Sequence, residues 1–317
     1  MKRTIAAIFR PWIDPEPMLS GSLAAIVTPM YPDGALDEAA FAALVDFHAE
    51  QGTDGLVVAG TTGESPTLTA DEKLGLFRHA VDRARGRLPV VAGTGSNATA
   101  ASVELTRAAC RTGVAAVLVV TPYYNKPTQE GLYRHFSAVA DASAVPVILY
   151  NVPGRTGCDL LPATVARLAG HPRIAGIKEA TPGIERPRQI RALCGGEFLI
   201  LSGDDPTACD MLLDGGQGVI SVTANVAPAL MHAMCSAALA GDAVAARAAD
   251  ERLRELHDAL FVESNPIPLK WVLAHMGLIR AGLRLPLTPL DSRHMRRLES
   301  ALAAAGVPAA TAPRAVS

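Results

Sequence analysis

Eight short apolar runs recur along the chain, and most of them are continuous instead of alternating with polar residues. The runs are Ser22–Thr28, Gly55–Ala59, Leu88–Ala92, Ala115–Thr121, Val145–Asn151, Ile174–Lys178, Phe198–Ser202 and Gly218–Val222. A continuous run of Val, Ile, Leu and Ala is typical of a strand that is covered on both faces. The pattern therefore predicts eight buried strands.

The segments between these runs carry helix signals. Asp37 precedes a segment whose apolar residues recur at helical spacing, and Gly52 closes that segment. Thr69 and Glu72 have the spacing of a capping box, which opens the next predicted helix. Strands that alternate regularly with helices in this way predict an α/β fold, a (β/α)8 TIM barrel.

A doubly wound sheet is the alternative fold. Its support is Gly93-Thr-Gly95-Ser-Asn-Ala98, which follows a predicted strand and loosely matches a dinucleotide-binding fingerprint. That fingerprint requires an acidic residue about 20 positions further on, and the chain has none there. A turn at which two backbone segments approach closely is the better interpretation.

After the eighth run, the chain is predicted to be helical to about residue 307. Asp242–Phe261 has apolar residues at helical spacing, and further helices are expected at 266–276 and 292–306. The predicted organisation has four parts: a flexible N-terminal extension at 1–17, the catalytic barrel at 18–240, a C-terminal helical region at 241–307 and a disordered tail at 308–317.

The composition of the chain narrows the range of partners and functions that it could have. The chain has 317 residues, 49% of them hydrophobic, with a formal net charge of −2 and only 4% aromatics, which disfavours nucleic acid as a partner. No apolar stretch approaches the roughly 18 residues of a membrane span. Five scattered cysteines without C-x-x-C, and a first segment unlike a signal peptide, predict a cytoplasmic protein, with Met18 as an alternative start. The eight histidines form no metal-binding motif, so no metal is expected.

Polar residues gather where the predicted strands end. In a (β/α)8 barrel, the active site lies at the carboxyl ends of the strands. The polar segments there are Gly60–Ser65, Thr121–Asn125, Tyr150–Arg155, Lys178 and Ser202–Asp205. We therefore expect a lysine, three tyrosines, two threonines and an arginine to converge on one rim.

Lys178 is the most informative of these residues, because it closes a predicted buried strand. An ammonium buried without a partner tends to lose its proton and to become a nucleophilic amine. A neutral amine at this position can form an imine with a carbonyl substrate. The alternative is a lysine that pairs with an acid or reaches out to solvent at the strand end.

The neighbouring strand ends offer the groups that imine chemistry needs. Tyr150 closes the adjacent strand, and its hydroxyl can carry protons to and from the intermediates. Arg155 offers a planar fork for a substrate carboxylate. Backbone N–H groups and hydroxyls in Gly60–Ser65 can hold a second carboxylate.

Each candidate also has a purely structural interpretation. Thr61, Thr62 and Gly203 could simply build tight turns, and Tyr123 is more readily explained as a packing or interface residue. Asp204-Asp205 could be a metal or acid pair, but we expect an N-cap on the following helix.

From about Met18 to residue 307, the chain resembles the dihydrodipicolinate synthase branch of the pyruvate-dependent class I aldolase family, which includes N-acetylneuraminate lyase. The matching motifs are Gly60–Ser65, Thr121–Asn125, Tyr150–Arg155, Ile177–Thr181, Ser202–Asp205, Val219–Asn225 and Asn265–Trp271. The resemblance implies a lyase that condenses pyruvate with L-aspartate 4-semialdehyde through a lysine Schiff base, on the way to diaminopimelate and lysine. It implies no cofactor, and a homo-oligomer, most simply a tetramer built as a dimer of dimers.

The resemblance also implies a role for each site residue. Lys178 matches the imine-forming lysine, and Tyr150 matches the proton carrier beside it. Thr61 and Tyr124 match the hydroxyls that complete a proton relay, the second coming from a neighbouring subunit. The substrate-binding matches are Thr62 and the Ile220 backbone for pyruvate, Arg155 for the carboxylate of the aldehyde, and Gly203 in the same pocket.

Two rival functions stay open. A sister aldolase that acts on a sugar acid is the nearer one, but sialic acid lyases usually have Ser-Thr where this chain has Thr61-Thr62, and they lack the arginine at 155. The other is a family member that has lost catalysis and binds a 2-oxo acid as a sensor. The intact Lys178, Tyr150 and Thr61 argue against a sensor.

The resemblance finally bears on feedback by lysine. The effector pocket of responsive relatives matches Ser65, Pro66, Ala70, Lys73, Asn97, Ala101 and Tyr123. Sensitive enzymes usually have a glutamate at the position of Ala101 and histidines at those of Ala70 and Lys73. Because this chain lacks that carboxylate, we expect weak or absent inhibition by L-lysine.

Overall fold

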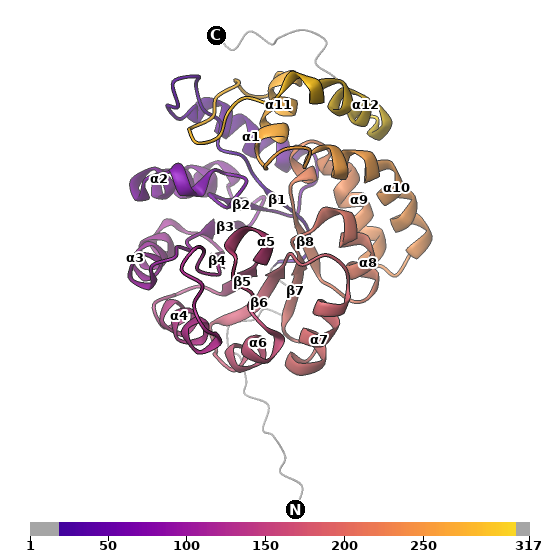
Figure 1. The fold of residues 1–317 in the computed structure, drawn as a ribbon. Helices are drawn as coiled ribbons and strands as arrows, with labels where there is room; N and C mark the ends of the chain where they lie inside the picture. The colour runs from indigo at the N-terminus through magenta and orange to yellow at the C-terminus, as the bar shows by residue number, and fades with distance from the viewer. Residues whose placement is uncertain (1–18, 309–317) are drawn as a thin grey trace, which may run out of the picture.

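The computed structural model describes residues 19–308. Eight parallel strands form a closed barrel in which every strand pairs with its neighbours in chain order, and β1 pairs with β8 (Figure 1). The strands are β1 (Gly21–Ala25), β2 (Gly55–Val58), β3 (Val90–Gly93), β4 (Ala116–Val120), β5 (Val147–Asn151), β6 (Ile174–Glu179), β7 (Leu199–Ser202) and β8 (Gly218–Ser221). The predicted (β/α)8 barrel is confirmed, and each predicted strand overlaps an observed one.

Helices surround the barrel and follow its strands. They are α1 (Glu38–Glu50), α2 (Ala70–Ala84), α3 (Thr99–Ala109), α4 (Gln129–Asp141), α5 (Pro153–Thr156), α6 (Pro162–Ala169), α7 (Glu185–Cys194), α8 (Ala208–Leu213) and α9 (Pro228–Leu239). Short 3-10 helices lie at η1 (Ser65–Thr67), η2 (Cys110–Thr112), η3 (Asp205–Thr207), η4 (Thr223–Asn225) and η5 (Ser292–His294).

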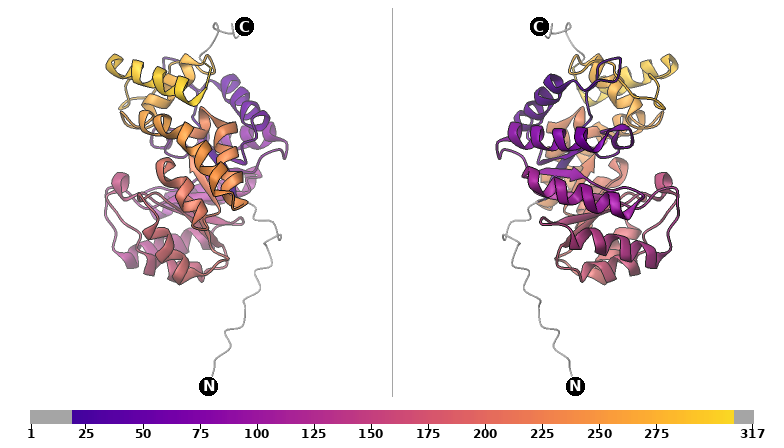
Figure 2. Two further views of the ribbon diagram at one scale, coloured as in Figure 1. Left: turned by 90° about the vertical axis from the view of Figure 1, so that its right-hand side faces the viewer. Right: turned by 90° about the vertical axis from the view of Figure 1, so that its left-hand side faces the viewer.

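Three further helices form the predicted C-terminal appendix. They are α10 (Ala243–Ala259), α11 (Ile267–His275) and α12 (Met295–Ala305). α10 packs between α9 and α12, and Figure 2 shows the appendix and α1 at the same end of the molecule. The predicted extension at 1–17 and all but residue 308 of the predicted tail lie outside the described residues, and the domain division itself remains a prediction.

The predicted helix caps are present. Asp37 Oδ1 accepts a hydrogen bond from the N–H of Ala40 at 3.0 Å. At the start of α2, the Thr69 hydroxyl accepts from the N–H of Glu72 at 3.2 Å, and the Glu72 carboxylate accepts from the N–H of Thr69 at 2.8 Å. These side chains satisfy N–H groups that have no partner within the first helical turn, which is why each helix begins where it does.

The N-cap predicted for Asp204-Asp205 is wrong. The Asp204 side chain makes no capping hydrogen bond and instead accepts from the Thr207 hydroxyl at 2.6 Å. Asp205 Oδ2 accepts from the backbone N–H groups of Val222 and Thr223, both at 2.9 Å. Barrel closure brings the start of η4 beside β7, so the carboxylate ties the ends of β7 and β8 together instead of capping its own helix.

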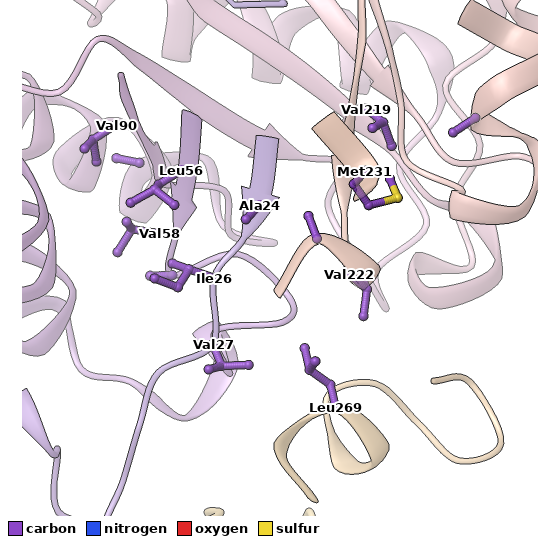
Figure 3. Packing of buried hydrophobic residues seen from close by; sticks show 14 of the residues in the cluster. Ala24, Ile26, Val27, Leu56, Val58, Val90, Val219, Val222, Met231 and Leu269 are labelled. Atoms are coloured by element: carbon purple, nitrogen blue, oxygen red, sulfur yellow. The ribbon is translucent and has the colours of Figure 1, made fainter. Parts of the chain in front are cut away.

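Most strand residues are apolar because both faces of each strand are covered. In β2, Val57 belongs to the cluster that fills the barrel, whereas Leu56 and Val58 belong to the larger cluster between barrel and helices. Figure 3 shows Leu56 and Val58 in that larger cluster, which also contains Leu269 of α11. Alternate residues thus meet different apolar partners, which explains the continuous runs in the sequence.

Candidate active site

A cavity of about 330 Å³ lies among the carboxyl ends of β2 to β5. Its lining residues are Ala59, Gly60, Thr61, Ser65, Pro66, Lys73, Gly93, Gly95, Ser96, Leu118, Val120, Tyr123, Tyr150, Val152, Arg155 and Thr156. The cavity therefore brings together Thr61, Tyr150 and Arg155, three of the residues that the sequence places in the site. The lining does not include the other five predicted site residues, which are Lys178, Thr62, Gly203, Ile220 and Tyr124.

Lys178 lies beside Tyr150 on the next strand. The two residues are paired in the register of β5 and β6, and each is 7% exposed. Lys178 Nζ lies 4.5 Å from the centre of the Tyr150 ring. The side chain of Tyr150 belongs to the apolar cluster inside the barrel, so the amine faces an apolar surface with one phenol hydroxyl.

Lys178 and Lys270 are the two buried lysines among residues 19–308, and their environments differ. Lys270 Nζ donates to the Glu64 carboxylate at 2.5 Å and to the carbonyl of Thr28 at 3.0 Å. Burial lowers the pKa of Lys270, and the carboxylate of Glu64 acts against that shift. Lys178 has no ion pair within the same range of residues. Pairing therefore marks Lys270 as structural and Lys178 as the candidate nucleophile.

Gly203 follows β7 and borders Lys178. A Cβ atom at this position would lie 2.8 Å from Lys178 Cε and 2.7 Å from the Cβ of Ala180. Because real Cβ atoms do not come that close, only glycine leaves the lysine chain its present course. Gly203 is thus next to the predicted nucleophile, as the sequence predicts, and close packing gives the reason.

The two threonines lie on the tight turn after β2. Within this turn, the N–H of Glu64 donates to the carbonyl of Thr61 at 3.1 Å. Thr61 faces the cavity, whereas Thr62 is only 3% exposed and accepts a hydrogen bond from Asn265 Nδ2 at 3.0 Å. The Thr62 hydroxyl keeps its own proton available for donation.

Arg155 enters the site from α5. Its Nη2 lies 3.4 Å from the carbonyl oxygen of Asn265, and its guanidinium borders the cavity. Ile220 on β8 is 2% exposed and belongs to the barrel-filling cluster that contains Tyr150. The positive fork of Arg155 thus borders the cavity, whereas Ile220 lies in the apolar interior of the barrel and is not one of the lining residues.

The two adjacent tyrosines after β4 point differently. Tyr123 lines the cavity, whereas the side chain of Tyr124 is 88% exposed and its backbone has a positive φ of 76°. Within this chain, Tyr124 is therefore not gathered into the cavity with Thr61 and Tyr150. An exposed tyrosine beside a site is available to a second molecule.

Two glycines at the end of β3 and just beyond it explain the motif that resembles a dinucleotide fingerprint. A Cβ on Gly93 would lie 2.4 Å from the carbonyl oxygen of Ala59, and a Cβ on Gly95 would lie 2.4 Å from the N atom of Val120. Both glycines let neighbouring backbones meet, so the interpretation as a close-approach turn is confirmed.

Asn265 is the main residue that sequence reasoning missed. It comes from the segment before α11, far along the chain from the strand ends, yet it contacts both Thr62 and Arg155. Its motif, Asn265–Trp271, carries a family resemblance, but nothing in its spacing relates it to the turn after β2. Only the packed appendix brings the two together.

Burial is the main cause of the pKa shifts of three ionisable side chains near the site. Burial raises the pKa of Glu179, which follows Lys178 and accepts from the Asn151 amide at 3.1 Å. Burial also raises the pKa of Asp204 and lowers that of Lys73 at the cavity.

Residues 19–308 contain no group of three or more His, Cys, Asp or Glu side chains that could hold a metal ion, and no helix long and apolar enough to cross a membrane.

Comparison with known proteins gives consistent results. The model of the dihydrodipicolinate synthetase family matches residues 18–305. The chain is 59% identical over 290 residues to the 4-hydroxy-tetrahydrodipicolinate synthase of Methylococcus capsulatus, covering 92% of this chain and 100% of that relative. It is 55% identical to the enzyme of the same name from Pseudomonas aeruginosa, covering 92% and 99% of the two chains.

Solved structures agree with these relatives. The chloride-inhibited dihydrodipicolinate synthase of Acinetobacter baumannii, complexed with pyruvate, has a TM-score of 0.90 at 49% identity, covering 91% of this chain and 99% of that one. The enzyme from Cyanidioschyzon merolae with lysine bound has a TM-score of 0.89 at 37% identity, covering 92% and 100%.

Proposed function

The chain belongs to the dihydrodipicolinate synthetase family, and we propose that it is a lyase that condenses pyruvate with L-aspartate 4-semialdehyde, as 4-hydroxy-tetrahydrodipicolinate synthases do. The observation that carries this proposal is the buried, unpaired Lys178 beside Tyr150 at the rim of the barrel. The relative complexed with pyruvate supports the choice of the first substrate. The product would enter the synthesis of diaminopimelate and lysine.

The amine of Lys178 begins the reaction. It attacks the keto carbon of pyruvate, and the resulting carbinolamine loses water to give a protonated imine. The imine withdraws electrons from the methyl group, so a proton leaves and an enamine forms. The enamine carbon attacks the aldehyde, and the amino group of that substrate then attacks the imine carbon. Ring closure in this way expels the lysine amine and frees the enzyme.

Proton transfer falls to the hydroxyls. Tyr150 is adjacent to the amine and can move protons in each step. Thr61, which shares the cavity with Tyr150, would connect it to Tyr124. Because Tyr124 is exposed in its own chain, the relay requires Tyr124 of a second subunit, and we propose a tetramer assembled as a dimer of dimers.

Two carboxylates need separate partners. The Thr62 hydroxyl and the backbone of Ile220 would hold the carboxylate of pyruvate near Lys178, with Gly203 leaving room for the lysine chain. The guanidinium of Arg155 would receive the carboxylate of the aldehyde at the outer part of the cavity. This division lets pyruvate bind and react before the second substrate arrives.

The proposed imine can be trapped. Borohydride added with pyruvate should reduce it to a stable adduct on the tryptic peptide that contains Lys178. Lys178→Ala should abolish the adduct, and mass spectrometry locates it. Lys126→Met serves as the control, because Lys126 is an exposed lysine in the segment after β4. An adduct on Lys126 or Lys270 would contradict the assignment.

Steady-state turnover with pyruvate and several aldehydes separates the rival functions. We expect L-aspartate 4-semialdehyde to be the preferred acceptor, because Arg155 offers its carboxylate a partner. Faster turnover with a sugar would favour a sister aldolase. Pyruvate binding without turnover of any aldehyde would favour a sensor. The proposed site of action is the cytoplasm.

A further inference from the structure

Glu64 and Lys270 form a buried ion pair beneath the turn that carries Thr61 and Thr62. Their side chains are 0% and 1% exposed, and the two residues are separated by 206 positions in the chain. Glu64 has a positive φ of 56°, a conformation that residues other than glycine rarely adopt. The turn therefore has an unfavourable backbone conformation at Glu64, the residue whose carboxylate pairs with Lys270 of α11.

Further bonds attach the same turn to its surroundings. The second carboxylate oxygen of Glu64 accepts from the N–H of Arg284 at 3.2 Å. The Thr28 hydroxyl donates to the carbonyl of Gly63 at 2.7 Å, and the carbonyl of Thr28 accepts from Lys270 Nζ at 3.0 Å. One lysine thus fixes both the turn and the segment after β1 that supports it.

The appendix contacts the turn at two points. Asn265 bonds the Thr62 hydroxyl, and Lys270, which follows it on α11, bonds the Glu64 carboxylate. Because both contacts come from one short segment, the placement of the threonines depends on where α11 docks. A purely packing role would not require two charges, since burying an ion pair gives little net stability compared with apolar residues of similar size.

We propose that Glu64 and Lys270 are positioning residues, which hold the turn so that Thr61 and Thr62 meet pyruvate correctly. The pair touches neither substrate and acts through the turn. This inference rests on the proposed function for its kinetic consequence, but the fixed geometry of the turn can be measured without any substrate.

Three variants test the proposal: Glu64→Gln, Lys270→Met and the double variant that combines them. Each single variant leaves one buried charge without its partner, whereas the double variant leaves none. Leu253→Ala is the matched control, because Leu253 is fully buried in α10 and its loss should reduce thermal stability without touching the turn.

Hydrogen exchange of residues 55–68, measured by mass spectrometry where every variant is folded, reports the turn directly. We expect exchange in this peptide to rise about tenfold or more in the single variants and to stay unchanged in Leu253→Ala. Wild-type exchange in every variant of the pair would overturn the proposal, whatever reaction the protein catalyses.

Kinetics supply the second measurement. We expect the pyruvate KM to rise about tenfold in the single variants, while saturating pyruvate still gives full borohydride trapping at Lys178. The double variant should recover its melting temperature and yet keep a raised KM. Recovery of KM together with stability, or a KM change no larger than in Leu253→Ala, would overturn the proposal.

If the single variants do not fold, the double variant decides alone. Absence of trapping in the wild-type protein would instead refute the proposed function.

Discussion

At the scale of single residues, partners decide what a buried charged group can do. Lys178 and Lys270 are both removed from water, yet only Lys270 has a carboxylate against its amine. The amine of Lys270 is engaged by an anion, whereas the amine of Lys178 has no such partner and can serve as the nucleophile toward a carbonyl. The same reasoning separates Arg155, which borders open space, from Arg284, whose guanidinium is occupied by Glu72.

Arg155→Ala should damage the second half of the reaction far more than the first. Arg155 is expected to bind the carboxylate of the aldehyde, and loss of one charge-assisted pair costs about 1.5–3 kcal/mol, or roughly tenfold to hundredfold. The specificity constant for the aldehyde should fall by that factor, while borohydride trapping with pyruvate stays close to wild type. Equal damage to both steps would assign Arg155 a structural role through its contact with Asn265.

At the scale of elements, two helices carry buried histidines against the barrel. His48 of α1 shares a hydrogen bond with Thr53 at 2.9 Å, and His135 of α4 shares one with Thr99 at 3.0 Å. Burial lowers the pKa of His48 to about 3 and that of His135 to about 4. Each helix is therefore packed around a neutral imidazole.

Stability should fall as pH drops below the ordinary histidine pKa of 6.5. In this range the unfolded chain takes up protons that the folded protein excludes, until the pH reaches the lowered folded pKa values. Between pH 6 and 5, each histidine should contribute a loss of about 1 kcal/mol in the free energy of unfolding. Urea titrations at several pH values measure it, and His48→Gln and His135→Gln should each flatten the slope. An unchanged slope in both variants would contradict the assignment.

At the scale of the whole molecule, the exposed side chain of Tyr124 favours the association of subunits. Its side chain is 88% exposed although it follows a barrel strand. The proposed relay needs this hydroxyl near Tyr150, and one chain alone does not bring them together. The proposed relay would therefore make catalysis depend on the association of subunits.

Mixing two inactive variants should restore activity. A Tyr150→Phe subunit can lend its Tyr124 to a Tyr124→Phe subunit, which keeps its own Tyr150, so one site of each mixed dimer becomes complete. After dissociation and reassembly, random mixing should give about a quarter of wild-type activity. Absence of any recovery, or a fully active monomer in analytical ultracentrifugation, would show that the relay is not shared.

The cavity also predicts the response to L-lysine. Ser65, Pro66, Lys73 and Tyr123, four positions of the expected effector pocket, line the cavity that Thr61 and Tyr150 share. The relative with lysine bound shows that such an effector can bind within the family, but here Ala101 lacks a carboxylate for its ammonium, and Lys73 adds a like charge. We expect weak or absent inhibition in an activity titration with L-lysine.

The charges in the expected effector pocket can be changed by substitution. Ala101→Glu with Lys73→His should move the enzyme toward sensitivity, because a charge-assisted hydrogen bond contributes about 1.5–3 kcal/mol. Half-inhibition of the unmodified enzyme below about a millimolar would show that another acid serves the pocket.

The barrel was predictable from the sequence because its signals are local. Most strands are continuous apolar runs, and the starts of α1 and α2 are encoded by side chains that bond backbone groups three residues away. Parallel strands in a closed barrel place their carboxyl ends on one rim, so Thr61, Tyr150 and Arg155 could be assigned to a common cavity before any coordinates. Residue chemistry suggested the roles of Lys178, Tyr150 and Arg155, family resemblance supplied the others, and the site assignments remain predictions.

Tertiary structure alone decided the contacts between segments far apart in the chain. Asp204-Asp205 has the local pattern of a helix cap, but the Asp205 carboxylate bonds backbone groups of η4 instead. Asn265 reaches Thr62, and Lys270 reaches Glu64, across more than two hundred residues. No local spacing encodes such pairs, because the free energy that forms them comes from docking the C-terminal appendix on the barrel. The sequence by itself determines which elements form and where the chemistry gathers, and packing determines which groups hold it in place.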